Sequence, residues 1–287
     1  MRRMWYIFAI LLFIWLTAVQ LGCLSMCTSD AGWKRKMREK SPALEPLFLD
    51  VNVPSGRRIH AVGVSTSDSL PCLVLVHGSP GSSDAFLEYL ADISMASAFR
   101  MVALDRPGFG YTEGFGRPEP SMQEQALAVK AIVDAFAPDQ KVILAGHSLG
   151  APVVARFAMD FPDQTAGLIF LGGSIDPEQE EHPWWQKAVD KAPLKWLTPK
   201  ALWTSNAEII PLEKELELME PGWQQIRCPV MLIHARNDRL VPYANVDFAH
   251  RMLINCPDLR DKTFEKGDHF VLWTQPDTVK KLLLEMR

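Results

Sequence analysis

The sequence predicts an α/β protein in which helices cover both faces of a mostly parallel sheet. Short apolar runs such as Cys72–Val76 and Val142–Ala145 alternate with amphipathic helical patterns, which is typical of buried parallel strands joined by helices. One of these runs leads directly into a serine flanked by glycines, and a helical pattern begins there. About 55 residues separate the strands that end near Gly172 and begin near Val230, which is too many for a simple connection and indicates an insertion.

Length and composition are those of a globular protein. The 287 residues can form one large α/β domain or two small ones, and 48% hydrophobic with 22% charged residues is ordinary for a packed core. The net charge of -4 gives no electrostatic reason to expect nucleic acid as a partner. The five cysteines form neither a C-x-x-C pair nor a Cys/His cluster at metal-ligand spacing. We therefore expect no metal, and we expect Cys72, Cys228 and Cys256 to be packing residues.

Residues 1–22 have the layout of a secretory signal or a single membrane anchor. Two arginines precede an uncharged apolar run from Met4 to about Leu21. In one interpretation Gly22-Cys23 is a lipoprotein cleavage site and lipidated Cys23 tethers the protein, although Gln20 stands where an aliphatic residue is usual. Cys27 has the expected aliphatic residue but follows the bulky Met26. In the other interpretation the segment remains as a helix, whose roughly 18 residues reach about 27 Å, just enough for a bilayer core.

Residues 23–46 are expected to form a polar linker. Its basic run Lys34–Lys40 outweighs the two N-terminal arginines, so the positive-inside rule favours a cytoplasmic C-terminal side for an uncleaved helix. For a cleaved signal the same run is a juxtamembrane linker that can be drawn to anionic lipid. We expect a membrane-attached protein, a lipoprotein or a single-pass anchor, that faces the periplasm or the exterior.

The remaining elements follow in order. Leu47–Val53 and Arg57–Val64 alternate apolar and polar residues around Pro54-Ser55-Gly56, which predicts a hairpin of two antiparallel edge strands. Further strands are expected at Cys72–Val76, Met101–Leu104, Val142–Ala145, Leu168–Leu171 and Val230–His234, with a last one ending at Lys262–Glu265. Helices are expected from Ser83 or Asp84 to Ala98 and at Gln123–Phe136, Leu149–Asp160, Ala244–Ile254 and Thr278–Glu285.

The insertion, residues 174–223, is predicted to be a small helical cap over the strand ends of a core formed by residues 47–173 and 224–287. It contains five of the nine tryptophans, Trp184, Trp185, Trp196, Trp203 and Trp223. Two interpretations remain open: these tryptophans form the core of the cap, or some of them line an apolar substrate pocket.

The serine lies in Gly146-His147-Ser148-Leu149-Gly150, between an apolar strand and a helix. This is the G-x-S-x-G arrangement in which a sharp turn exposes the serine hydroxyl at the sheet edge. The flanking residues must be tiny because strand and helix nearly collide there. The alternative is a Gly-rich turn that happens to hold a serine, and the position between a strand and a helix disfavours it.

From about Leu47 to its end the chain resembles the α/β-hydrolase superfamily with an inserted cap. The resemblance implies a mostly parallel eight-stranded sheet and assigns the nucleophile to Ser148. It assigns the acid to Asp238, which follows the next-to-last strand in Ile233-His234-Ala235-Arg236-Asn237-Asp238, and the histidine to His269 in Gly267-Asp268-His269-Phe270. The order Ser, Asp, His along the chain is the one expected of this fold.

The chemistry of these residue types agrees with the resemblance. A serine hydroxyl is a poor nucleophile until a base removes its proton, and His269 is the expected base. Asp238 would orient the imidazole and stabilise its cation. Asp176, after the strand that ends near Gly172, is the rival acid, whereas Asp268 is expected to point elsewhere.

The other histidines are expected to have structural roles. His147 is expected to pack beside the turn, and His77 to support its loop by hydrogen bonding. The remaining ones lack a matching Ser/Asp context: His60, His182, His234 and His250.

Two backbone N–H groups are the expected oxyanion donors. One belongs to Leu149, directly after the nucleophile at a helix N-terminus. The other should come from His77-Gly78-Ser79-Pro80, and because Pro80 has no N–H the donor must be Ser79. A plain turn at Ser79-Pro80-Gly81 is the alternative.

The loop Asp105–Gly110 resembles one shared by epoxide hydrolases, haloalkane dehalogenases, carbon–carbon bond hydrolases and serine esterases. The first two classes use an aspartate nucleophile and this chain has Ser148, so a structural role is expected for the loop.

The sequence therefore predicts a serine hydrolase that cleaves a neutral, lipophilic carboxylic ester through an acyl-enzyme, without a metal or organic cofactor. Three alternatives remain. The same triad serves hydrolases of carbon–carbon, amide or lactone bonds. It also serves acyltransferases, in which an alcohol replaces water. The third is a non-catalytic binding protein of the same fold, against which the intact Ser148, Asp238 and His269 argue.

Overall fold

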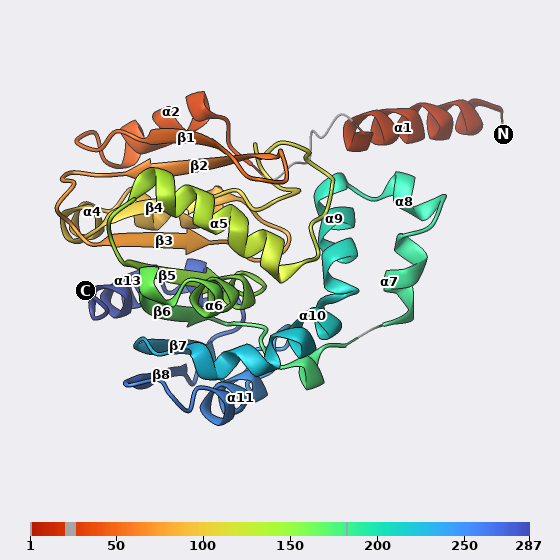
Figure 1. Cartoon of the computed structure of the whole chain (residues 1–287). Coiled ribbons are helices and arrows are strands. Elements are labelled where there is room, and N and C mark those ends of the chain that lie inside the picture. Colours follow the sequence, from red (N-terminus) through yellow and green to blue (C-terminus); the bar gives the residue numbers. More distant parts are fainter. Residues whose placement is uncertain (1, 21–26, 182) are drawn as a thin grey trace.

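The structure is a computed structural model that describes residues 2–20, 27–181 and 183–287. Eight strands form one sheet in the order β1-β2-β4-β3-β5-β6-β7-β8 (Figure 1), which confirms the predicted fold class. The strands are β1 (Leu47–Asn52), β2 (Arg58–Val64), β3 (Cys72–Val76), β4 (Arg100–Leu104), β5 (Val142–His147), β6 (Thr165–Leu171), β7 (Val230–Ala235) and β8 (Leu259–Phe264).

Strand direction divides the sheet into two parts. From β4 through β8 all neighbouring strands are parallel, whereas β1, β2 and β4 pair antiparallel. The predicted hairpin is present, but the prediction that both of its strands lie at the edge is wrong. Strand β2 pairs with β4 on its other side, from Ala61 opposite Leu104 to Val64 opposite Met101. Its side chains are buried on both faces after Arg58, as an interior strand requires.

Two hydrophobic clusters lie on opposite faces of the sheet, because successive side chains of a strand point to opposite sides. In β3, Val74 and Val76 belong to one cluster, and Leu73 and Leu75 to the other. The first cluster contains side chains of α5 (Met122–Phe136), α6 (Gly150–Asp160) and α11 (Ala244–Met252). The second contains side chains of α3 (Leu87–Leu90), α4 (Ile93–Ala98), α12 (Val271–Thr274) and α13 (Pro276–Leu284).

The helix expected up to Ala98 is divided into three pieces: a 3-10 turn (Ser83–Phe86), α3 and α4. The break has a clear local cause. Asp92 has an extended backbone, and its carboxylate accepts hydrogen bonds from the Ser94 and Met95 backbone N–H groups. Asp92 thus caps a new helix rather than continuing the old one.

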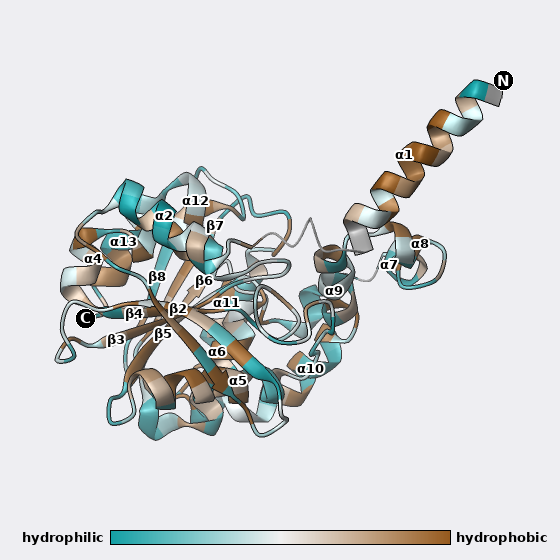
Figure 2. Cartoon of the chain, turned by 90° about the horizontal axis from the view of Figure 1, so that it is seen from above, coloured by the Kyte–Doolittle hydropathy of each residue, from teal (hydrophilic) through white to brown (hydrophobic). Residues whose placement is uncertain are grey.

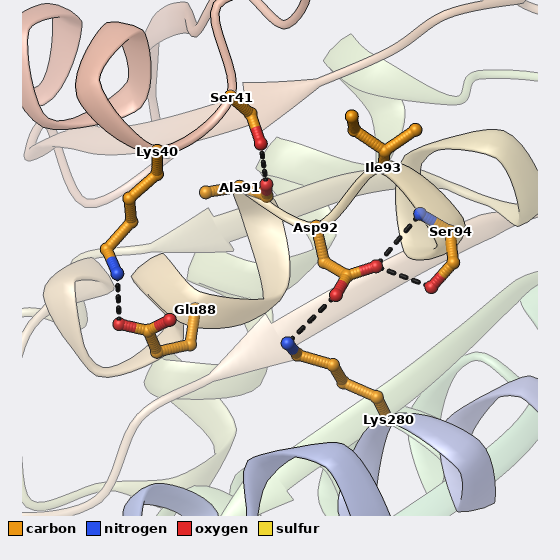
Figure 3. A pocket seen from close by; sticks show the side chains of 8 residues that line it. All are labelled: Lys40, Ser41, Glu88, Ala91, Asp92, Ile93, Ser94 and Lys280. Atoms are coloured by element: carbon orange, nitrogen blue, oxygen red, sulfur yellow. Dashed lines mark hydrogen bonds and ion pairs between the residues drawn. The ribbon is translucent and has the colours of Figure 1, made fainter.

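The prediction of a linker is wrong for residues 30–40, which form α2 (Asp30–Lys40). Trp33 and Met37, four residues apart on an otherwise charged helix, are buried in the second cluster. Figure 3 shows how the end of α2 is fixed above a shallow polar pocket: Lys40 pairs with Glu88 at 2.7 Å, and the Ser41 hydroxyl donates to a backbone carbonyl of the α3–α4 turn. The apolar pair and these polar contacts together dock the segment on the core.

Helix α1 (Arg2–Gln20) projects away from the sheet, with its largest apolar side chains exposed (Figure 2). It contacts the cap through Trp15, whose indole N–H donates to the Leu197 carbonyl at 2.9 Å. Within the part of the chain that the structure describes, no helix is long and apolar enough to cross a membrane. Residues 21–26, with the candidate cleavage and lipidation site at Cys23, lie outside the described residues.

Between β6 and β7 the chain forms the cap. Its helices are α7 (Trp184–Val189), α8 (Leu194–Leu197), α9 (Lys200–Ile209) and α10 (Leu212–Met219), followed by a 3-10 turn (Glu220–Gln225). Helices α9 and α10 lie at the end of the sheet toward which the parallel strands point (Figure 1).

Both interpretations of the cap tryptophans are corrected by the structure. Three of the five are exposed, namely Trp184, Trp185 and Trp196. Trp223 is fully buried in the first core cluster against Phe170 and Phe248. None of the five is among the residues that line the cavity at the strand ends, which takes its tryptophan, Trp273, from α12 instead. The short helices α7 and α8 lie away from the sheet (Figure 2), and Gln186 is the one buried residue that they contain.

Candidate functional site

Ser148 occupies the tight turn between β5 and α6. Its φ of 53° is the only positive value among non-glycine residues that the structure describes. Such a value is costly for a side-chain-bearing residue and marks a constrained position. The flanking glycines are required by contact, because a Cβ on Gly146 would lie 2.3 Å from the Gly150 carbonyl oxygen and one on Gly150 would lie 2.3 Å from that of Val76.

Asp238 and His269, which follow β7 and β8, are brought together at the ends of neighbouring strands. The Nδ1 atom of His269 lies 2.7 Å from Oδ2 of Asp238. The other carboxylate oxygen accepts the backbone N–H groups of Leu240 and Val241, each at 2.9 Å. Burial opposes ionisation of Asp238, but these hydrogen bonds, with that of His269 the strongest, hold its pKa below the usual value.

Ser148 and His269 line one cavity of about 740 Å³ at the strand ends. His147, next to the nucleophile, fixes His269 from the other side. The two rings are 4.8 Å apart between centroids, and Nε2 of His147 lies 3.2 Å from the His269 carbonyl oxygen. Burial, together with the neighbouring His269, lowers the pKa of His147 to about 3, so this imidazole is a neutral donor to that carbonyl. With Nδ1 of His269 engaged by Asp238, Nε2 is the nitrogen left to exchange a proton in the cavity.

The rival acids have other partners. Asp176 accepts the Glu178 backbone N–H at 3.0 Å, and its second oxygen lies 3.7 Å from Arg251. Asp268 accepts the backbone N–H of Phe270. The structure thus brings Asp238 to the imidazole, while Asp176 and Asp268 cap local turns.

The loop after β3 lies against the serine. A Cβ on Gly78 would approach that of Ser148 to 2.8 Å, so only glycine permits this close passage. Ser79 and Leu149 both line the cavity beside Ser148, where their backbone N–H groups were expected. His77 supports the loop: its Nε2 accepts the Arg106 backbone N–H at 2.9 Å, so the proton is on Nδ1 and is donated to the Gly78 carbonyl at 2.7 Å.

Arg106 connects this loop to the cap. The guanidinium donates to the His77 and Gly78 carbonyls at 2.9 and 3.1 Å. It also forms a two-pronged pair with Glu208 of α9, at 2.8 and 3.0 Å, and both side chains are fully buried. Glu208 in turn accepts the Ser79 hydroxyl. A carboxylate from the cap therefore holds the residue that carries the expected second oxyanion donor.

Sequence reasoning missed Glu208. It lies on a helix with mixed polar residues and 102 positions from Arg106, and no motif marks it. The structural role expected for the loop Asp105–Gly110 agrees with its geometry. Asp105 accepts the backbone N–H groups of Ser83 and Tyr111 at 2.7 and 2.8 Å, which fixes the turn from which Arg106 extends. Among the residues that the structure describes, no group of His, Cys, Asp and Glu could hold a metal ion.

Comparison with known proteins assigns the family. The model of the alpha/beta hydrolase family matches residues 73–282. The chain belongs to this family. This member of the family carries the strand–serine–helix turn at the centre of its sheet.

Two curated relatives match different shares of this chain and carry the names of different activities. The hydrolase is 22% identical to a 2-hydroxy-6-oxo-6-phenylhexa-2,4-dienoate hydrolase of Burkholderia cepacia, over 87% of this chain and 98% of that one. It is 30% identical to a 1-acylglycerol-3-phosphate O-acyltransferase of Arabidopsis thaliana, over 58% of this chain and 40% of the relative. The hydrolase thus spans less than half the length of the plant acyltransferases that it matches.

Solved structures share the fold. A membrane phospholipase A superposes with a TM-score of 0.67 at 19% identity, covering 100% of this chain and 98% of the other. An esterase from Exiguobacterium antarcticum gives the same TM-score at 15% identity, covering 83% of this chain and 98% of its own.

Proposed function

We propose that the hydrolase cleaves carboxylic esters through an acyl-enzyme, with Ser148 as nucleophile, His269 as base and Asp238 as orienting acid. The observation that carries this proposal is the 2.7 Å contact of Asp238 with His269, which lines the same cavity as Ser148. The ends of three neighbouring parts of the sheet carry these residues, which are far apart in sequence, and this placement supports a role in nucleophilic catalysis.

The steps follow from these positions. Ser148 Oγ attacks the ester carbonyl carbon while Nε2 of His269 accepts the hydroxyl proton. The carbonyl oxygen becomes an oxyanion that receives the N–H groups of Leu149 and Ser79. Collapse of this intermediate breaks the C–O bond, and His269 returns the proton to the leaving alcohol. Water, deprotonated by His269, then attacks the acyl-enzyme and releases the acid and free Ser148.

The cavity supports a lipophilic substrate. Apolar side chains from the core and the cap line it, among them Pro80, Ile209, Leu212, Phe270 and Trp273. Such a lining stabilises a hydrocarbon acyl chain by burial. The fold is shared with a membrane phospholipase A, which is compatible with this substrate class.

Membrane attachment through the N-terminal segment is part of the proposal. The exposed apolar side chains of α1, including Trp5, Phe8 and Phe13, are suited to a lipid environment. That anchor requires the segment to remain uncleaved. In the alternative, cleavage at Gly22-Cys23 removes α1 and lipidated Cys23 anchors the hydrolase, facing the periplasm or the exterior. Membrane fractionation of Cys23→Ala and Cys27→Ala variants tests the lipid anchor: loss of attachment in Cys23→Ala alone supports it, and unchanged attachment in both excludes it.

A fluorophosphonate probe tests the nucleophile. It should label the folded wild type and fail to label Ser148→Ala, and ester turnover should be lost with it. A chain-length series of p-nitrophenyl and monoacylglycerol esters then defines the acyl preference. A folded wild type that takes up no label would favour a non-catalytic binding protein instead.

Acyl transfer is a second candidate, because the Arabidopsis relative is named an acyltransferase and is 30% identical over 58% of this chain. The acyl-enzyme is the same, but an alcohol replaces water in the second half-reaction. Adding glycerol or a lysophospholipid to a turnover assay decides between them. A new ester formed in preference to free acid supports transfer, and free acid alone supports hydrolysis.

A further inference from the structure

The outer helices of the cap carry an exposed surface of an unusual kind. Trp184 and Trp185 are 82% and 50% exposed, and Leu194 is 44% exposed. Fully buried aromatic side chains are common in this protein, so tryptophans this open to solvent are not explained by packing. We call Trp184, Trp185, Lys187, Lys191 and Leu194 the cap surface.

The exposed cap helices are locally basic. The protein as a whole has a net charge of -4, but residues 183–203 contain four lysines and a single aspartate. Lys187 and Lys191 are exposed beside the tryptophans. Aromatic and aliphatic side chains interleaved with lysine are the composition of helices that lie in a membrane interface, where the rings enter the headgroup layer and the ammonium groups meet anionic phosphate.

The position of the cap surface also fits a bilayer. Helix α8 contacts the apolar helix α1, through the Trp15–Leu197 hydrogen bond, and the two lie together at the same end of the molecule (Figures 1 and 2). Helix α7 borders the active-site cavity, since Pro183 and Gln186 are among its lining residues. When the N-terminal segment is retained, a lipid surface that held α1 would therefore lie near the cap surface and the cavity.

We propose that the cap surface binds the surface of an anionic lipid bilayer as a second contact beside the N-terminal segment. Its tryptophans insert between headgroups and its lysines pair with lipid phosphates. This contact holds the cavity next to the bilayer, from which a lipophilic ester can reach Ser148. The inference deepens the proposed function, but the contact itself does not depend on catalysis.

The experiment uses the full chain carrying Ser148→Ala, so that turnover plays no part. Trp184 is replaced by p-benzoylphenylalanine, and the protein is irradiated on vesicles of phosphatidylcholine with phosphatidylglycerol. Ile254 receives the same replacement as the matched control. It is 64% exposed, but it precedes β8. It therefore lies at the end of the sheet where the parallel strands begin, whereas the cavity lies where they finish. Mass spectrometry then counts lipid adducts at each site.

Lipid adducts at position 184 and a yield about tenfold lower at position 254 are expected. Lys191→Gln should lower the adduct yield at position 184 by roughly fivefold, because one basic side chain near an anionic surface changes the binding constant by about this factor. Vesicle-bound protein without lipid adducts at 184, equal yields at both positions, or adducts to a second protein copy at 184 would each overturn the proposal. Protein that does not sediment with the vesicles would overturn it too. Fluorophosphonate labelling of the protein with Ser148 intact reports separately on the proposed function.

Discussion

The two ends of the active-site cavity are built in opposite ways. On the sheet side Asp238 and His269 are buried and paired with each other, and the Asp238 carboxylate also accepts the backbone N–H groups of Leu240 and Val241. On the outer cap, α7 and α8 expose their largest side chains and make few contacts with the sheet. The difference indicates that the core fixes the positions of Asp238 and His269, whereas the outer cap leaves large side chains open to solvent. The link between them is Glu208, which belongs to the cap but is fully buried.

Substitution of the proposed acid, Asp238, is the sharpest test of the part of the cavity that the core forms. Asp238→Asn should lower ester turnover by about 10⁴-fold, because the amide cannot stabilise the imidazolium and selects the wrong tautomer of His269. Asp176→Asn, which removes the rival carboxylate at a comparably buried position, should leave turnover nearly unchanged. Steady-state kinetics on a p-nitrophenyl ester measures both. The reverse result would move the acid to Asp176.

Two tryptophans of the insertion, one buried and one exposed, allow the contributions of the core and of the outer cap to stability to be compared. Trp223 is fully buried against Phe170 and Phe248, so Trp223→Ala should lower the free energy of unfolding by about 3–5 kcal/mol. Trp184 is exposed, so Trp184→Ala should change it by less than about 0.5 kcal/mol. Urea unfolding in the absence of lipid gives both values. Similar losses for the two variants would mean that the outer cap is packed as tightly as the core.

Local patterns predicted the parts of the site that local geometry determines. The apolar run Val142–Ala145 and the glycines around Ser148 define a strand, a tight turn and a helix within nine residues, and no distant partner is needed to recognise them. The strand ends that carry Asp238 and His269 follow from the same alternation. Five tryptophans in one insertion, by contrast, were compatible with a cap core or with the lining of an apolar pocket. Their exposure depends on how far each short helix lies from the sheet, which no pattern in the sequence encodes.

Buried polar contacts between segments far apart in the chain could not be predicted from the sequence either. Glu208 is one of several glutamates on the cap helices, and a pattern of charges usually means a solvated face. It is buried only because Arg106 and Ser79 meet it from the core. The burial of Trp33 and Met37 on helix α2 was equally hard to predict. They are two apolar side chains on an otherwise charged helix, and they are buried only because the core offers a site that receives them.

The link between the regions can be broken selectively. Glu208→Gln keeps the shape of the side chain but removes the charge that pairs with Arg106, so the loop carrying Ser79 should lose its exact position. We expect kcat to fall by about 10²-fold with little change in KM, since a misplaced oxyanion donor affects the transition state more than the bound ester. Stopped-assay kinetics on a short p-nitrophenyl ester separates the two constants.

The control for this variant is Glu217→Gln on α10, an exposed glutamate of the same cap, which should have wild-type kinetics. A buried pair that loses one charge can also destabilise the fold. The thermal midpoint is therefore recorded with the kinetics, and Glu208→Asp serves as a second variant that retains the charge. A folded Glu208→Gln protein with unchanged kcat would show that the cap carboxylate does not position the loop.

The smallest expected effect concerns pH and the buried histidine beside the nucleophile. His147 has a pKa of about 3 in the folded protein, against about 6.5 in an unfolded chain. Between these values the unfolded state binds one more proton at this residue, so its contribution to stability falls as the pH is lowered, by about 1.4 kcal/mol per pH unit. The free energy of unfolding of the wild type minus that of His147→Gln should therefore rise with this slope from pH 4.5 to 6 and become constant above pH 7.5. A difference that does not change between pH 4.5 and 6 would mean that His147 accepts a proton in the folded state, and that its ring is open to water rather than enclosed between the turn and His269.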